Sequence, residues 1–207
     1  MVFLLAGCAS FQAATDVQSG RQALLINKPE QALAYFEQAA ENNPGYIYNA
    51  YYFSEGVWTY VGRTQYSLGK LQDAHRSLER ALSVYPDDNL ARLYLGLTLA
   101  RGDDRGGGLK EINAGMKGLN DWLEHINATH PITAFWDPTH QIRAELQKDL
   151  AMIRGRDIDW PALIASGEWI GKQMEEEIDR VRRDEQRFRD REFDHRRGLS
   201  VGVGFGF

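Results

Sequence analysis

Residues 58–86 read WTYVGRTQYSLGKLQDAHRSLERALSVYP, and this stretch decides the fold. Gly62 and Ala74 are small enough to let two packed helices approach closely. Gly69 can take the left-handed conformation that ends a helix. Pro86 stops the second helix, since proline lacks the backbone N–H and crowds the preceding turn. The stretch therefore predicts a helical hairpin.

The pattern recurs at matching offsets on both sides of this stretch. Gly20 and Pro44 are separated by 24 residues, the same spacing as the glycine and proline quoted above. Downstream, Gly96 follows Gly62 by 34 residues. A single helical hairpin cannot bury its own apolar face, so we expect neighbouring hairpins to stack and form a shared core.

With these offsets, residues 13–128 resemble a tetratricopeptide repeat (TPR) array, whose repeats are about 34 residues long. The resemblance implies an all-α solenoid of helical hairpins. It also implies a non-enzymatic protein whose inner helices hold other proteins or peptides. The three repeats are expected near 13–46, 55–88 and 89–127.

The chain departs from a regular array in two places. Eight extra residues separate the first two repeats and fall in YIYNAYYF (46–53), which we expect to lengthen the first helix of the second repeat. In the third repeat, the second helix is expected to run past a normal length to about residue 127. Altered ends of this kind suit a terminal capping element.

A loop and a capping helix are predicted over residues 129–160, followed by a long charged helix over 161–197. In the capping helix, Ile142 and Leu146 belong to one apolar stripe. The second half of the long helix is dense in both signs of charge. Two interpretations remain open for it: a solvated helix held by i,i+4 ion pairs, or a coiled-coil or partner-docking arm.

The last segment, GLSVGVGFGF (198–207), alternates large apolar residues with small ones. A period of two places the large groups on one face of a strand, which predicts a short β-like tail. The tail is either frayed or a contact with a partner sheet edge or a membrane. The contact residues would be Val201, Val203, Phe205 and Phe207.

The stretch LLAGC (4–8) contains the only cysteine of the chain. It resembles a bacterial lipobox, in which small residues precede a cysteine that becomes lipidated. The resemblance implies a signal remnant and linker over 1–12. It also implies an anchor at Cys8 that holds a periplasm-facing lipoprotein, with Ala9 favouring the outer membrane. The alternative is a cytoplasmic protein with a chance apolar N-terminus that buries Cys8.

Composition and motifs argue against several functions. The net charge of −5 disfavours nucleic acid binding, which needs a cationic face. A single cysteine allows no intramolecular disulfide and no thiolate metal cluster. Because the sequence has no nucleophile elbow, zinc-binding helix or phosphate loop, we predict no catalytic residue, no metal and no cofactor.

The TPR resemblance implies a partner-binding groove on the inner helices. Its arginines could grip a carboxylate, and its aromatic and leucine side chains could hold apolar groups. Alternatively, the leucines pack under the C-terminal helices. The predicted groove residues are Arg21, Leu24, Thr59, Tyr60, Arg63, Tyr66, Leu93, Tyr94, Leu97 and Arg101.

The leading hypothesis is a lipid-anchored adaptor that helps to assemble an envelope complex through protein partners. The rival hypothesis is a structural subunit of a membrane-associated oligomer, which would use the long helix and the C-terminal strand.

Overall fold

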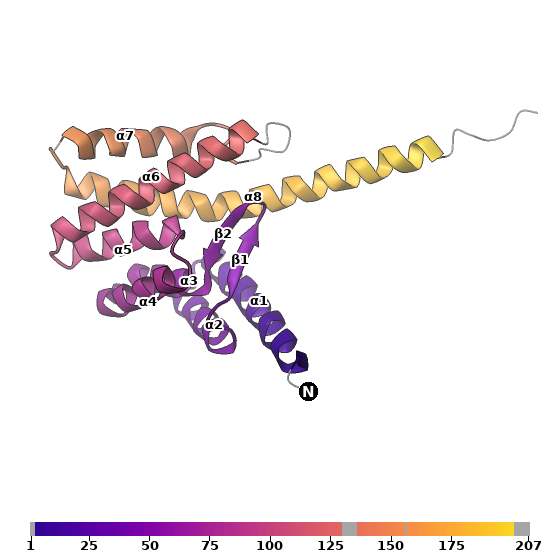
Figure 1. Ribbon diagram of the computed structural model, residues 1–207, viewed down its shortest axis with the longest axis horizontal. Coiled ribbons are helices and arrows are strands. Elements are labelled where there is room, and N and C mark those ends of the chain that lie inside the picture. The colour runs from indigo at the N-terminus through magenta and orange to yellow at the C-terminus, as the bar shows by residue number, and fades with distance from the viewer. Residues whose placement is uncertain (1–2, 130–135, 156, 201–207) are drawn as a thin grey trace, which may run out of the picture.

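The computed structural model describes the backbone of residues 3–129, 136–155 and 157–200, and the side chains of 9–129, 136–155 and 157–191. These residues form α-helices and one two-stranded sheet (Figure 1). In chain order the elements are α1 (Phe3–Leu25), α2 (Pro29–Asn42), β1 (Ile47–Ala50), β2 (Phe53–Gly56), α3 (Val57–Ser67), α4 (Leu71–Val84), α5 (Asn89–Arg101), α6 (Arg105–Thr129), α7 (Gln141–Gly155) and α8 (Trp160–Ser200).

Helices α1 to α6 pair into the hairpins α1/α2, α3/α4 and α5/α6, which stack against one another. A Cβ atom at Gly62 would lie 2.5 Å from Cγ of Leu78, and one at Gly96 would lie 2.5 Å from the backbone nitrogen of Ile112. Both crossings therefore need glycine. Gly69 has a φ of +73° at the break after α3. The prediction of an all-α, TPR-like stack is confirmed.

The prediction for residues 46–53 is wrong, because this stretch belongs to a β-hairpin and does not extend α3. Strands β1 and β2 pair antiparallel, with Ala50 opposite Phe53. The stretch is rich in aromatic residues, which favour strands over helices. The connecting residues Tyr51 and Tyr52 both have positive φ, as the tight turns of such hairpins require.

Two indole N–H groups hold this strained turn. Trp122 Nε1 donates to the carbonyl oxygen of Tyr52 at 3.2 Å, and Trp136 Nε1 donates to that of Tyr51 at 3.1 Å. Trp122 comes from α6, and Trp136 precedes α7. The hairpin is therefore tied to the C-terminal side of the array.

Helix α6 ends at Thr129, slightly beyond its predicted end. Its buried side chains Leu119 and Leu123 lie in the main hydrophobic core together with Ile142 and Leu146 of α7. Helix α7 packs on α6, as the capping helix predicted from its apolar stripe would do.

Helix α8 is the longest element, and its two halves have different surroundings. The first half contributes Leu163, Ile170, Met174, Ile178 and Val181 to the core, all of them fully buried. The second half projects beyond the rest of the molecule (Figure 1). None of the described helices is long and apolar enough to cross a membrane.

The structure corrects the predicted boundary between the long helix and the tail. Helix α8 begins at Trp160 and continues to Ser200, so the first three residues of the predicted tail are helical. No proline follows Arg197, and an established helix adds further residues readily. The β-like tail is not supported, and its contact residues Val201, Val203, Phe205 and Phe207 lie outside the described residues.

Candidate protein-interaction site

Helix α8 lies across the inner helices α1, α3 and α5, on the side where the sequence predicts a partner. Arg182 of α8 donates to the Gln18 side chain of α1 at 2.9 Å. Near the other end of the crossing, a Cβ atom at Gly167 would lie 2.9 Å from the Leu97 side chain of α5. Helix α8 therefore fills much of the concave face, which is the surface formed by the inner helices α1, α3 and α5.

The arginines of this face do bind carboxylates, but the carboxylates belong to the same chain. Arg21 Nε pairs with Glu175 Oε1 at 2.5 Å, and its Nη2 pairs with Asp179 Oδ1 at 2.9 Å. Arg63 pairs with Glu55 of β2 at 2.5 Å and lies 3.5 Å from Glu175. These contacts join α1 and α3 to α8, and β2 to α3.

A weaker pair joins α5 to the same helix. Arg101 Nη2 lies 2.8 Å from Glu168 Oε1, and the Tyr66 hydroxyl donates to the same oxygen at 2.6 Å. Both Arg101 and Glu168 are more than a third exposed, so solvent screens this ion pair.

The buried charge cluster is incompletely satisfied. Burial raises the pKa of the Glu55 carboxyl to about 7. The guanidinium of Arg63 opposes that rise, whereas the carboxylates of Glu175 and Asp88 add to it. Within the described residues, Glu55 Oε2 and the Tyr60 hydroxyl have no hydrogen-bond partner. Burial alone would lower the pKa of Arg63, but the nearby carboxylates raise it well above its usual value, so the guanidinium stays charged.

Most predicted groove residues are covered. Thr59 donates to Asp88 at 2.7 Å, and the Tyr60 ring stacks on Phe36 at 4.9 Å, so neither faces an open groove. Leu24 is half-buried and Arg101 is exposed. The buried members are Arg21, Thr59, Tyr60, Arg63, Tyr66, Leu93, Tyr94 and Leu97.

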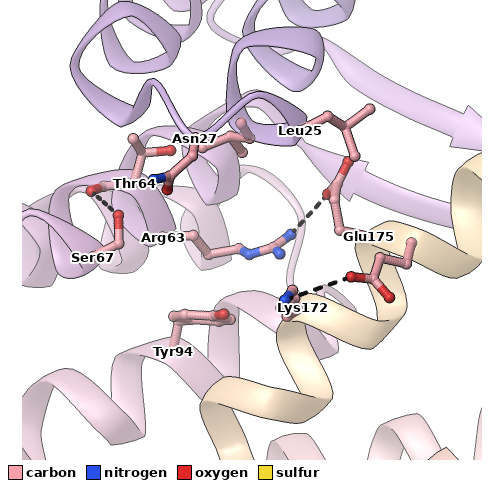
Figure 2. Close-up of a pocket in the computed structure, with 10 residues that line it drawn as sticks. Leu25, Asn27, Arg63, Thr64, Ser67, Tyr94, Lys172 and Glu175 are labelled. Carbon is pink, nitrogen blue, oxygen red and sulfur yellow. Dashed lines mark hydrogen bonds and ion pairs between the residues drawn. The ribbon is translucent and has the colours of Figure 1, made fainter.

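A cavity of about 570 Å³ remains where α8 leaves the inner helices uncovered (Figure 2). It lies between the C-terminal ends of α1 and α3, the middle of α5, and α8. Leu24, Arg63 and Tyr94, all predicted groove residues, meet here. The other lining residues are Leu25, Asn27, Thr64, Ser67, Lys172, Glu175 and Glu176.

The cavity wall combines the cations of Arg63 and Lys172, the carboxylates of Glu175 and Glu176, hydroxyl groups and leucine side chains. The guanidinium of Arg63 lies 5.0 Å from the centre of the Tyr94 ring. The Thr64 and Ser67 hydroxyls donate to backbone carbonyls of α3, which leaves their lone pairs available. Lys172 lies 3.8 Å from Glu176, and its side chain is 73% exposed. It is therefore the most exposed charged side chain of the wall, and it can change conformation to contact a ligand.

A second cavity of about 380 Å³ lies on the other side of Leu25, which lines both. Its wall contains no charged side chain. It is formed by Ser19, Gln22, Ala23, Leu25, Ile26, Gln31 and Tyr35.

Sequence reasoning missed the α8 residues of the wall, because nothing local indicates that this helix returns to the concave face. Within the described residues, no cluster of acidic, histidine or cysteine side chains has the arrangement of a metal site. Cys8 belongs to the first turns of α1, but its side chain lies outside those described, so its lipidation stays a prediction.

The comparisons with known proteins agree with the array. Residues 62–105 match the family model described as tetratricopeptide repeat. This segment runs from the Gly62 crossing through α4 and α5. No curated protein matches the chain. The match supports a TPR protein, and repeats of this class generally mediate protein–protein interaction.

Proposed function

We propose that this protein is a non-catalytic adaptor, tethered to a bacterial envelope membrane through a lipid on Cys8, that gathers protein partners into an envelope complex. The observation that best supports this proposal is the composition of the concave face. This face already holds one helix through Arg21 and Arg63 and leaves an open, chemically mixed cavity beside that helix.

Support for the tether comes from the position of Cys8 as well as from the lipobox-like residues before it. The N-terminal end of α1 points away from α5, α6, α7 and α8 (Figure 1). Among the described side chains, the hydrogen bond nearest the N-terminus that joins α1 to the rest of the molecule is donated by Asn43 Nδ2 to Ser10 Oγ at 3.1 Å. A lipid on Cys8 would therefore anchor the array at the N-terminal end of α1, while the cavity lies at the opposite end of that helix.

The tether is tested by metabolic labelling with an alkyne-bearing palmitate in a bacterial host. We expect labelling and membrane fractionation for the parent protein, and loss of both for Cys8→Ser. Equal labelling of the two proteins, or a parent protein found only in the cytoplasmic fraction, would refute the proposed anchor.

The adaptor role is tested by a photo-crosslinking amino acid placed in cells at position 25, beside the cavity. A matched position is Arg76, which is exposed on α4. We expect discrete protein adducts from position 25 and none of the same mass from position 76. The absence of adducts at position 25, or identical adducts from both positions, would contradict the adaptor proposal.

The rival is a structural subunit of a membrane-associated oligomer, and the observation in its favour is that the second half of α8 extends beyond the rest of the molecule (Figure 1). The i,i+4 ion pair of Arg189 with Glu185 stabilises this half as a solvated helix even without a partner. Light scattering of the detergent-solubilised protein separates the hypotheses. A discrete multimer that becomes a monomer on removal of residues 192–207 would favour the subunit.

A further inference from the structure

Strand β1 has a free edge. The Val57 N–H donates to the carbonyl oxygen of Tyr46 at 2.9 Å, directly beside the first residue pair of the hairpin. Hydrogen-bonded and non-hydrogen-bonded pairs alternate along an antiparallel ladder, so the peptide groups of Ile47 and Asn49 point away from β2. Within the described residues, neither N–H has a hydrogen-bond partner. The Ile47 carbonyl oxygen accepts only from the exposed Asn49 side chain, at 3.2 Å.

The other edge and one face of the hairpin are occupied. The Gly56 N–H, on the outer edge of β2, donates to Asp88 at 2.8 Å. On one face, Tyr48 and Glu55 bond to the arginines that hold α8. The edge of β1 lies on the side of the hairpin away from α3 and α4 (Figure 1). This edge is therefore the one at which a further strand can be added.

We infer that the edge of β1 binds residues 201–207 of a second copy of the chain as an added strand, so that two copies exchange these segments. An open edge is a template for another strand, which gains main-chain hydrogen bonds there. The inference rests on the hypothesis of a structural subunit and names the surface that joins its subunits. It leaves the adaptor function unchanged.

The sequence of the segment suits this edge. It reads VGVGFGF, with no charged side chain and no proline to remove a backbone donor. As a strand, it would place its large side chains on one face. Each face of β1 has a half-buried apolar side chain beside the edge, Ile47 on one and Tyr48 on the other. Because glycine makes a lone strand entropically costly, we expect the strand to form only on such an edge.

The reach of the chain excludes its own β1 as the acceptor. Tyr48 of β1 is joined to α8 through Arg21, which donates to Asp179 at 2.9 Å. From there, α8 continues for 21 residues to Ser200, a distance of about 32 Å. Residues 201–207 span at most about 25 Å when fully extended. They cannot return along the helix and also lie beside β1, so the edge that they meet belongs to another copy.

The exchange is reciprocal. Each copy has one projecting half of α8 and one free β1 edge, so a two-fold axis allows both segments to bind at once and closes the assembly. The two projecting halves then run antiparallel past each other. Their described part, residues 183–191, contains both signs of charge, which allows opposite charges to face one another across the axis.

The first test is a disulfide trap between two differently tagged copies of the full chain, both in a Cys8→Ser background. One copy carries Asn49→Cys, and the other carries one cysteine substitution at a time along 201–206. We expect crosslinks between copies at alternate positions, because only alternate side chains of a strand share a face with position 49. The matched control is Arg76→Cys, at an exposed position on α4, which should give no such pattern.

The second test separates the backbone of the edge from its side chain. Asn49→Pro removes an outward N–H and leaves the ladder with β2 intact, whereas Asn49→Ala keeps that N–H. In analytical ultracentrifugation, Asn49→Pro should weaken the dimer about thirtyfold, the value of one backbone hydrogen bond at each of two edges. Asn49→Ala should dimerise as the parent protein does. Circular dichroism and the melting temperature should show that both variants are folded.

Four results would overturn the inference. They are crosslinks at position 49 without the alternate pattern, crosslinks only within a chain that carries both cysteines, crosslinks only between two Asn49→Cys copies, and equal dimer stability of Asn49→Pro and Asn49→Ala. A multimer that is still lost on removal of residues 192–207 would then preserve the subunit hypothesis and refute only β1 as the acceptor. A parent protein that stays monomeric would refute both.

Discussion

Replacing Glu55 with glutamine should remove a proton-linked part of the stability of this protein. The Glu55 side chain is fully buried, its Oε2 has no hydrogen-bond partner within the described residues, and burial raises its pKa from 4.5 to about 7. The folded protein therefore binds a proton at this carboxyl over a pH range in which the unfolded chain has released it. Stability contributed by that proton is fully present below pH 4.5 and is lost as the pH rises to about 7.

The size of the effect follows from the shift. A difference of about 2.5 pKa units corresponds to about 3 kcal/mol, since one unit is about 1.4 kcal/mol. For a chain of this length, that is on the order of 6–12 °C in melting temperature. Asp88 and Asp149 are also buried with raised pKa values, so the parent protein alone does not isolate Glu55.

The assay is urea unfolding of the parent protein and Glu55→Gln at intervals from pH 4.5 to 8. We expect the free energy of unfolding of the parent, minus that of the variant, to fall by about 3 kcal/mol across this range. A difference that stays constant with pH would show that the pKa of Glu55 is the same in the folded and unfolded states. A difference that rises with pH would show that Arg63 dominates the Glu55 environment.

Three further changes test the packing. Gly96→Ala places a Cβ against the backbone of α6 and should lower the free energy of unfolding by about 1–3 kcal/mol in the same denaturation assay. Gly106→Ala, at an open position, should change it by no more than about 0.5 kcal/mol. Ile178→Ala removes a fully buried side chain of α8 and should cost about 2–5 kcal/mol; a smaller loss would mean that α8 is loosely docked. Arg21→Met breaks a buried ion pair and should lower the free energy of unfolding by about 3–5 kcal/mol. Arg101→Met breaks an exposed ion pair and should lower it by less than about 1 kcal/mol, as measured by thermal unfolding. Equal losses in the two variants would contradict the difference in burial between the two pairs.

The helical hairpins could be predicted because their signals are local. Gly62 must touch Leu78 only sixteen residues later, and both lie in one repeat, so the contact leaves a pattern of fixed spacing. The β-hairpin could not be predicted from that pattern, since it is an insertion between repeats. Its aromatic residues favour a strand, but the frame of the repeats suggested a longer helix.

The candidate site could be predicted only in its chemistry. The arginines of the inner helices do bind carboxylates, as the sequence suggested, yet Glu175 comes from more than a hundred residues away. Nothing in the charged helix distinguishes a carboxylate that pairs with the array from one that faces water. Which carboxylates pair with the array depends on which face of α8 contacts α5, and Gly167 and Gly171 allow that close contact.

The burial of α8 also determines where a partner can bind. Removing this helix from the concave face would expose five fully buried apolar side chains. Each contributes about 1.5–3 kcal/mol, so release would cost on the order of 8–15 kcal/mol, as much as the whole stability of an ordinary domain. Buried ion pairs at Arg21 and Arg63 would be broken as well. A partner that displaced α8 would therefore have to supply the binding energy of a micromolar to subnanomolar complex before gaining any net affinity. Partners that bind with ordinary affinity must instead use the surface that α8 leaves open, and around Leu25 that surface has both exposed apolar area and an accessible cation.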